Sequence, residues 1–269
     1  MSKLESDISL VIITANALRH KFVTNQLIKD FQVKGVISEI KRPLRQGDTV
    51  EENEIIAKHS RERDEKEIEY FGAEKDFNLP TEKIMRVDYE EANSQKVYDW
   101  IKKLNPNYVV LFGSGIVRDP LLSEYKGRII NMHLGLSPYY RGSATTFWPF
   151  VEKEPECIGV TVHLAVLKVD AGSILGQSRP EINPDDGAHD IGYRNIIAGA
   201  ELLTRCIREY SAGKIQPKPQ RLDIGKVFKH KDFNAQSVLK MKENFSNGMI
   251  ELYLENKPQR DAQYPIIEA

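Results

Sequence analysis

Residues 8–13 read Ile-Ser-Leu-Val-Ile-Ile, a run that is apolar apart from Ser9 and rich in branched side chains. The run is too short for a helix, and its composition is typical of a strand buried on both faces, as in a parallel sheet. A helical pattern follows from about Arg19 to Asp30, and residues 33–38 form a second strand pattern. The segment predicts a strand–helix–strand unit with the spacing of a doubly wound α/β sheet.

Further strand and helix patterns continue along the chain. The sequence predicts strands over residues 83–87, 108–112, 157–166 and 173–180, and helices over residues 94–103 and 189–209. Residues 129–130 lead directly into Asn131, so we expect Asn131 and His133 at the carboxyl end of a strand, where open α/β sheets bind ligands. The predicted fold class is α/β, with a mostly parallel, Rossmann-like sheet.

A charged segment interrupts this pattern between Arg42 and about Asn78. Acidic and basic side chains crowd residues 61–69, just before Tyr70 and Phe71. The segment is typical of a solvated helix with mixed salt links, and it also fits a lid or an insertion that faces the substrate. The sequence leaves both interpretations open.

The last part of the chain differs in composition from the rest. Residues 216–221 are rich in Pro, Lys and Gln, and a short mixed tail follows them. We therefore predict a main domain over residues 1–212, and a linker with a small appendage over residues 213–269. Tails of this length pack on their own domain or on a second subunit, so a homodimer is one alternative.

Composition narrows the partners of the chain. The 269 residues include 38 basic and 39 acidic side chains, for a net charge of -1, so no nucleic-acid partner is expected. Cys157 and Cys206 have no partners at short spacing, and the sequence predicts no metal site. No apolar run approaches the length of a membrane span, and an acidic residue, Glu5, stands where a signal peptide needs an apolar run. These features predict a cytoplasmic protein without a membrane partner.

Two segments near the middle of the chain carry the polar residues of a candidate site. Residues 131–142 read NMHLGLSPYYRG, and residues 169–175 read VDAGSIL. His133 can take a proton near neutral pH, Asn131 can donate to an oxyanion, and Asp170 can orient His133. Together, these three groups can catalyse the transfer of an acyl group to an amine. By themselves, the same residues also fit a structural His–Asp pair and a capping asparagine.

The surrounding frame resembles a known family. The motif Asn131-x-His133-x-x-Leu136-Ser137-Pro138-x-x-Arg141-Gly142, with residues 159–163 and 169–175, resembles the catalytic domain of 10-formyltetrahydrofolate-dependent formyltransferases. That family includes glycinamide ribonucleotide transformylase, methionyl-tRNA formyltransferase, the sugar N-formyltransferases and formyltetrahydrofolate deformylase. The resemblance covers about residues 7–210. It implies 10-formyltetrahydrofolate as the formyl donor and Asn131, His133 and Asp170 as the catalytic residues.

The resemblance also implies two binding surfaces. The folate pocket would be made by the loop after the strand at residues 108–112 and by the loop that holds the aspartate. Its predicted residues are Leu111, Phe112, Gly113, Gly115, Ile116, Val117, Val169, Asp170 and Gly172. The loop after His133 carries the predicted substrate-binding residues Tyr139, Tyr140, Arg141 and Trp148. Aromatic rings there would stack on a base or sugar, and Arg141 would meet a phosphate or hold the loop.

Departures from the family pattern narrow the acceptor. Residues 14–19 lack the glycine-rich turn with which purine-pathway members bind a phosphate, which disfavours glycinamide ribonucleotide. The short segment after the linker disfavours methionyl-tRNA, and the start of the first strand near residue 8 disfavours the deformylase. The sequence thus predicts formyl transfer to a nucleotide-linked aminodeoxy sugar. Hydrolysis of the donor, formylation of another amine such as an amino acid, methionyl-tRNA, and a folate-binding module without activity stay open as alternatives.

Overall fold

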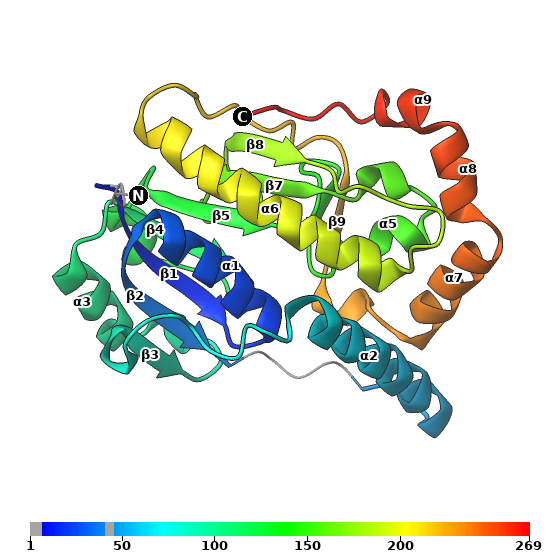
Figure 1. The fold of residues 1–269 in the computed structure, drawn as a ribbon, viewed down its shortest axis with the longest axis horizontal. Coiled ribbons are helices and arrows are strands. Elements are labelled where there is room, and N and C mark those ends of the chain that lie inside the picture. The colour runs from blue at the N-terminus through cyan, green and yellow to red at the C-terminus, as the bar shows by residue number, and fades with distance from the viewer. Residues whose placement is uncertain (1–6, 41–45) are drawn as a thin grey trace.

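A seven-stranded sheet lies at the centre of the fold in the computed structural model, which describes residues 7–40 and 46–269 (Figure 1). Glu5 and Arg42 lie outside the described residues. The strand order is β3-β2-β1-β4-β5-β7-β8. The strands are β1 (Ser9–Ala15), β2 (Gln32–Glu39), β3 (Ile84–Val87), β4 (Tyr108–Phe112), β5 (Ile129–His133), β7 (Val160–Leu164) and β8 (Ile174–Ser178). The five strands from β3 to β5 are parallel, β7 pairs antiparallel with β5, and β8 pairs antiparallel with β7, which confirms the predicted α/β class with a mostly parallel sheet.

Strand β1 is buried along its whole length, as its apolar run predicts. Its side chains alternate between the two faces of the sheet. Leu10 and Ile12 pack in the core beneath helices α1 (Leu18–Asp30) and α6 (Ala188–Ser211). Val11 and Ile13 pack on the other face in a second core with α3 (Gln95–Leu104). Burial of each such side chain is worth about 1.5–3 kcal/mol, so both layers stabilise this strand.

The structure confirms the predicted helices to within a few residues at each end, and it shortens two strands. The predicted strand at residues 157–166 begins only at Val160, because residues 155–157 form a 3-10 turn that opens with a proline. The predicted strand at residues 173–180 spans 174–178. The short elements are α4 (Leu121–Glu124), η1 (Thr81–Lys83), η2 (Glu91–Asn93), η3 (Pro155–Cys157) and η4 (His230–Asp232).

The charged segment forms one long helix, α2 (Val50–Phe71), which begins in a capping box made by Thr49 and Glu52. One side of α2 is buried, with His59 and Glu67 among the buried side chains, and Glu67 pairs with Arg19 of α1. The helix prediction is confirmed. Contact of this segment with a substrate stays a prediction.

The C-terminal segment packs closely on the rest of the chain. Its elements are β9 (Lys226–Phe228), α7 (Ala235–Ser246), α8 (Met249–Glu255) and α9 (Lys257–Asp261), and Figure 1 shows the three helices along one end of the sheet. Strand β9 pairs in parallel with β6 (Tyr140–Gly142), in the loop that follows His133. Helices α7 and α8 share one hydrophobic core with this loop and with α5 (Trp148–Val151). Within the described ranges, no helix is long and apolar enough to cross a membrane.

Candidate active site

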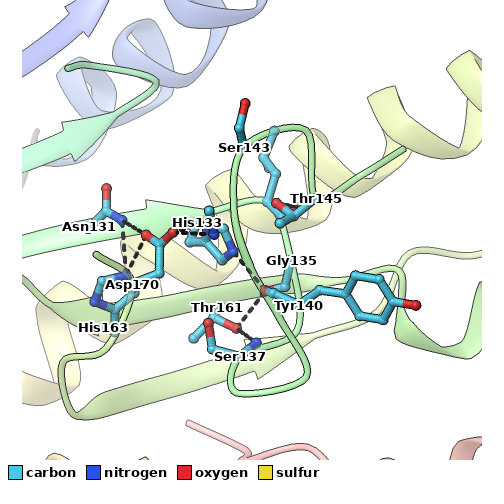
Figure 2. Close-up of polar contacts among 12 residues, drawn as sticks. Asn131, His133, Gly135, Ser137, Tyr140, Ser143, Thr145, Thr161, His163 and Asp170 are labelled. Atoms are coloured by element: carbon cyan, nitrogen blue, oxygen red, sulfur yellow. Dashed lines mark hydrogen bonds and ion pairs between the residues drawn. The ribbon is translucent and has the colours of Figure 1, made fainter. Parts of the chain in front are cut away.

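The last three residues of β5 place Asn131 and His133 at the carboxyl end of a central strand. Asn131 lies between Leu111 of β4 and His163 of β7, and His133 lies opposite Thr161. Side chains two residues apart in a strand point to the same side of the sheet. Figure 2 shows Asn131 and His133 both directed toward Asp170.

Asp170 reaches this strand end from the loop between β7 and β8. Its backbone is left-handed, with φ at 49°, and its side chain is only 10% exposed. One carboxylate oxygen, Oδ2, accepts a hydrogen bond of 2.9 Å from the backbone amide of Gly142 and lies 3.4 Å from Nδ1 of His133. The other, Oδ1, lies 3.4 Å from Nδ2 of Asn131. The structure therefore brings the three predicted catalytic residues together around one carboxylate.

Burial and charge set the protonation of this group. Burial by itself would raise the pKa of Asp170, but the adjacent His133 and His163 and the Gly142 amide outweigh it and hold the pKa well below its usual range. Burial lowers the pKa of His133, and the charge of Asp170 opposes that change. At neutral pH the carboxylate is ionised and the imidazole is neutral, so His133 can accept a proton.

The loop after His133 supports the imidazole from the opposite side. Nε2 of His133 donates to the carbonyl oxygen of Tyr140 at 3.0 Å, so in the neutral ring Nδ1 is the unprotonated nitrogen and faces Asp170. Gly135 is required at this point, because a Cβ there would lie 2.7 Å from Nε2 of His133. Thr161 accepts a hydrogen bond from the amide of Ser137 and donates to the carbonyl oxygen of Gly135, which ties the loop to β7 (Figure 2).

His163 is a fourth member of the cluster and was not among the residues predicted for the site. Its Nδ1 lies 2.9 Å from the carbonyl oxygen of Leu164 and carries the proton in the neutral ring, so Nε2 accepts from Nδ2 of Asn131 at 2.9 Å. The alternation of residues 160–163 was the available signal, because it predicts that His163 and Thr161 share one face of β7.

The amide of Asn131 is oriented by these contacts. Its nitrogen faces His163 and Asp170, and its oxygen points away from them (Figure 2). Donation to a substrate oxyanion therefore requires a half-turn of the amide, which would break its present contacts with His163 and Asp170. The oxyanion role of Asn131 stays a prediction.

The predicted folate residues divide into buried and exposed groups. The side chains of Leu111, Phe112 and Val117 lie in the hydrophobic cores, whereas Ile116 and Val169 are 50% and 41% exposed. The aspartate loop exposes two further apolar side chains, Val166 and Leu167. Exposed apolar side chains on these two loops suit the flat, partly apolar ring of a folate. The assignment of Gly113, Gly115, Gly172 and the other six residues to a folate pocket stays a prediction.

Two residues that the sequence analysis did not assign hold these loops in place. Glu39, buried at the end of β2, accepts a 2.6 Å hydrogen bond from the amide of Gly115. Gln220, in the segment between α6 and β9, donates to the carbonyl oxygens of Asp170 and Gly172 at 3.0 and 2.6 Å. Contacts between such distant parts of the chain leave no local pattern in the sequence.

The predicted substrate-binding residues are mostly buried. The rings of Tyr140 and Trp148 each stack on Phe228, with ring centroids 5.7 and 4.5 Å away. Arg141 is 4% exposed and donates to the carbonyl oxygen of Ile224, a contact that ties this loop to the C-terminal segment. These three side chains do not face solvent, because the C-terminal segment covers them. Tyr139 is half-buried, and the substrate contacts of all four residues stay predictions.

Known proteins similar to this chain share its fold and part of its sequence. A methionyl-tRNA formyltransferase of Thermodesulfovibrio yellowstonii is 34% identical over 125 residues, 46% of this chain and 40% of that protein. One from Clostridium acetobutylicum is 26% identical over 196 residues, 72% of this chain and 57% of that protein. The chain thus aligns with only about half the length of these curated relatives.

Solved structures with the same fold include a phosphoribosylglycinamide formyltransferase from Anaplasma phagocytophilum, with a TM-score of 0.55 and 14% identity over 83% of this chain and 99% of that chain. A 4-N formyltransferase from Francisella tularensis has a TM-score of 0.55 and 19% identity over 84% of this chain and 78% of that chain. A family model described as formyl transferase matches residues 9–207, which include the whole sheet and the cluster around Asp170. The chain belongs to the formyl transferase family.

Proposed function

We propose that this chain transfers a formyl group from 10-formyltetrahydrofolate to the primary amine of a small molecule. The observation that carries the proposal is the convergence of an amide, an imidazole and an ionised carboxylate, with Asp170 within 3.4 Å of both Asn131 and His133. Because Asp170 is buried and ionised, it can stabilise a positive charge that forms on His133 during the reaction.

The transfer requires one new bond, one broken bond and one proton transfer. The donor supplies an activated formyl group: the amine nitrogen attacks the formyl carbon, and the bond from that carbon to the folate nitrogen breaks. His133 takes the proton lost by the amine on Nδ1, its unprotonated nitrogen beside Asp170, and returns that proton to the leaving folate nitrogen. The amide of Asn131, turned outward, would donate to the oxyanion of the tetrahedral intermediate.

Arg141 supports an acceptor that carries an anionic group. Its side chain is buried, and among the described residues no carboxylate pairs with it and its Nε has no hydrogen-bond partner. An uncompensated buried guanidinium is costly, and a phosphate that reached it past the covering C-terminal segment would compensate it. We therefore favour a nucleotide-linked aminodeoxy sugar as the acceptor. Methionyl-tRNA is a second candidate, because the curated relatives named above act on it by their names.

One assay separates these acceptors. The full chain is incubated with 10-formyltetrahydrofolate and, in separate reactions, nucleotide amino sugars, amino acids, methionyl-tRNA or buffer alone. Release of tetrahydrofolate and the mass of the formylated product are measured, with His133→Asn as the inactive variant and His230→Asn as its matched control. Release that depends on a small amine supports the proposal. Formylation of methionyl-tRNA alone, or steady cleavage of the donor in buffer, would overturn it.

A further inference from the structure

We propose that His59, Glu62 and His189 form a binding site for a divalent metal ion of the zinc type. The site lies at the seam where α2 meets the start of α6 and the side of α7. One ligand atom from each of the three residues lies within 4.8 Å of the other two. The inference is independent of the proposed formyl transfer, and it goes against the sequence-based expectation of no metal site, which rested on the cysteines.

The helices place the three side chains on facing surfaces. His59 and Glu62 are three residues apart on α2 and so lie on one side of that helix. His189 is in the first turn of α6, and its ring centroid lies 4.8 Å from that of His59. The cluster therefore joins the charged helix α2 to a helix that covers the central sheet.

His59 is the residue whose surroundings point to a missing partner. Its side chain is 7% exposed, and its Nδ1 is buried without a hydrogen-bond partner among the described residues. Aromatic rings, those of Phe147 and Phe233, occupy the other contacts of this imidazole. A buried ring nitrogen without a partner costs free energy, and coordination or an added proton would recover it. The buried, ring-lined surroundings of His59 disfavour an added charge on this imidazole.

The ligand set suits zinc. Two imidazoles and one carboxylate are a known tetrahedral zinc set that leaves a fourth position for water. With Zn–N and Zn–O bonds of about 2.0–2.2 Å, neighbouring ligand atoms in such a site lie about 3.4 Å apart, so side-chain rotations must contract the cluster.

Lys242 of α7 competes for Glu62. Its Nζ lies 2.8 and 2.9 Å from the two carboxylate oxygens, and both side chains are 37% exposed. Partly exposed ion pairs contribute little stability, so Glu62 can exchange the ammonium for a metal ion. A surface cavity of about 600 Å³, lined in part by Glu62, His189 and Lys242, gives a route from solvent. Arg63 is the other cation whose charge acts on both histidines.

Zinc binding to the full chain, without a histidine tag and after treatment with a chelator, tests the proposal. Isothermal titration with ZnCl₂ at pH 7 gives the affinity, thermal unfolding with and without ZnCl₂ gives the linked stabilisation, and Co²⁺ absorbance reports tetrahedral coordination. The variants are His59→Asn, His189→Asn, Glu62→Gln and Lys242→Met. His230→Asn is the matched control, because His230 lies in the C-terminal segment and outside the cluster.

We expect each ligand variant to weaken zinc binding by at least about 100-fold, beyond the 10- to 100-fold typical of outer-shell partners. Lys242→Met should tighten binding by about tenfold or more, because it removes the competing cation, and His230→Asn should leave binding unchanged. Glu62→Gln and Lys242→Met alter partly exposed side chains, so they test the site even if a histidine variant fails to fold. Equal affinity in the parent and in all ligand variants, or no binding by both the parent and Lys242→Met, would overturn the proposal.

Discussion

Asp170→Asn tests whether the charge of Asp170, rather than its shape, assists His133. The substitution keeps the size of the side chain, and the asparagine oxygen can still accept the hydrogen bond from the Gly142 amide. What it removes is the negative charge 3.4 Å from Nδ1 of His133. If His133 becomes an imidazolium during formyl transfer, that charge stabilises the transition state more than the ground state.

The size of the effect follows from the distance. Two unit charges 3.4 Å apart in a medium with an effective dielectric constant of about 20 attract by about 5 kcal/mol. A change of about 1.4 kcal/mol in the barrier alters the rate tenfold, so complete loss of this attraction would lower kcat by about 10³- to 10⁴-fold. This is an upper bound, because the imidazolium forms only partly in the transition state.

The assay is the pH dependence of kcat/KM with the acceptor that the amine panel identifies. A base works when it is unprotonated, so the rate falls as pH decreases through the pKa of His133. Burial lowers that pKa and Asp170 opposes the change, so the acid limb of the parent lies below pH 6.5 and that of Asp170→Asn lies lower still. Asp185→Asn, at an exposed aspartate, is the control. A variant with nearly full kcat, or an acid limb that moves to higher pH, would refute the reasoning.

Three further changes test the loops and the buried histidine. Gly172→Ala places a Cβ 1.7 Å from the carbonyl oxygen of Leu164, so we expect a loss of about 3 kcal/mol in urea unfolding, whereas Gly192→Ala, with its nearest neighbour 3.6 Å away, should not destabilise. Gln220→Ala removes two hydrogen bonds to the aspartate loop, so we expect it to lower the free energy of unfolding by about 2 kcal/mol and to raise KM for the donor. Gln216→Ala, at an exposed residue, is the control and should change neither quantity. An unchanged KM in Gln220→Ala would contradict the role of Gln220. Because burial lowers the pKa of His59 from 6.5 to about 4, the unfolded chain takes up this proton first as pH falls, and stability should drop by up to about 3 kcal/mol between pH 6.5 and 4. Thermal melting of His59→Asn over that pH range should show a smaller loss of stability than the parent. An equal loss in both proteins would contradict the assignment of the effect to His59.

The sequence predicted the sheet well because its signals are local. The strand at residues 108–112 has the predicted bounds, since five consecutive uncharged residues between Asn107 and Gly113 suit a buried strand of that length. The placement of Asn131 and His133 at a strand end depends on the same kind of signal. The sequence motifs around Asn131 and His133 indicated the family, and the family model matches residues 9–207.

The sequence could not predict contacts between segments that lie far apart along the chain. The aromatic side chains of Tyr140 and Trp148 are of the kind that binding surfaces use, but the ring of Phe228 stacks on both of them. Nothing within residues 140–148 indicates that a strand some eighty residues later packs there. His59 and His189 escaped notice for the same reason, because only the docking of α2 on α6 brings them together.

The C-terminal segment is joined to the site by its backbone as well as by its side chains. Strand β9 pairs with β6, whose last residue, Gly142, supplies the amide that binds the carboxylate of Asp170. Gly142 has φ at 94° and a Cβ there would lie 2.1 Å from the carbonyl oxygen of Phe228, so this approach admits only glycine. Gln220 donates to the backbone carbonyl oxygens of Asp170 and Gly172 and so holds the aspartate loop from the C-terminal segment. A boundary at residue 212 therefore separates residues that jointly position Asp170, and the residues that follow α6 help to set the geometry of the site.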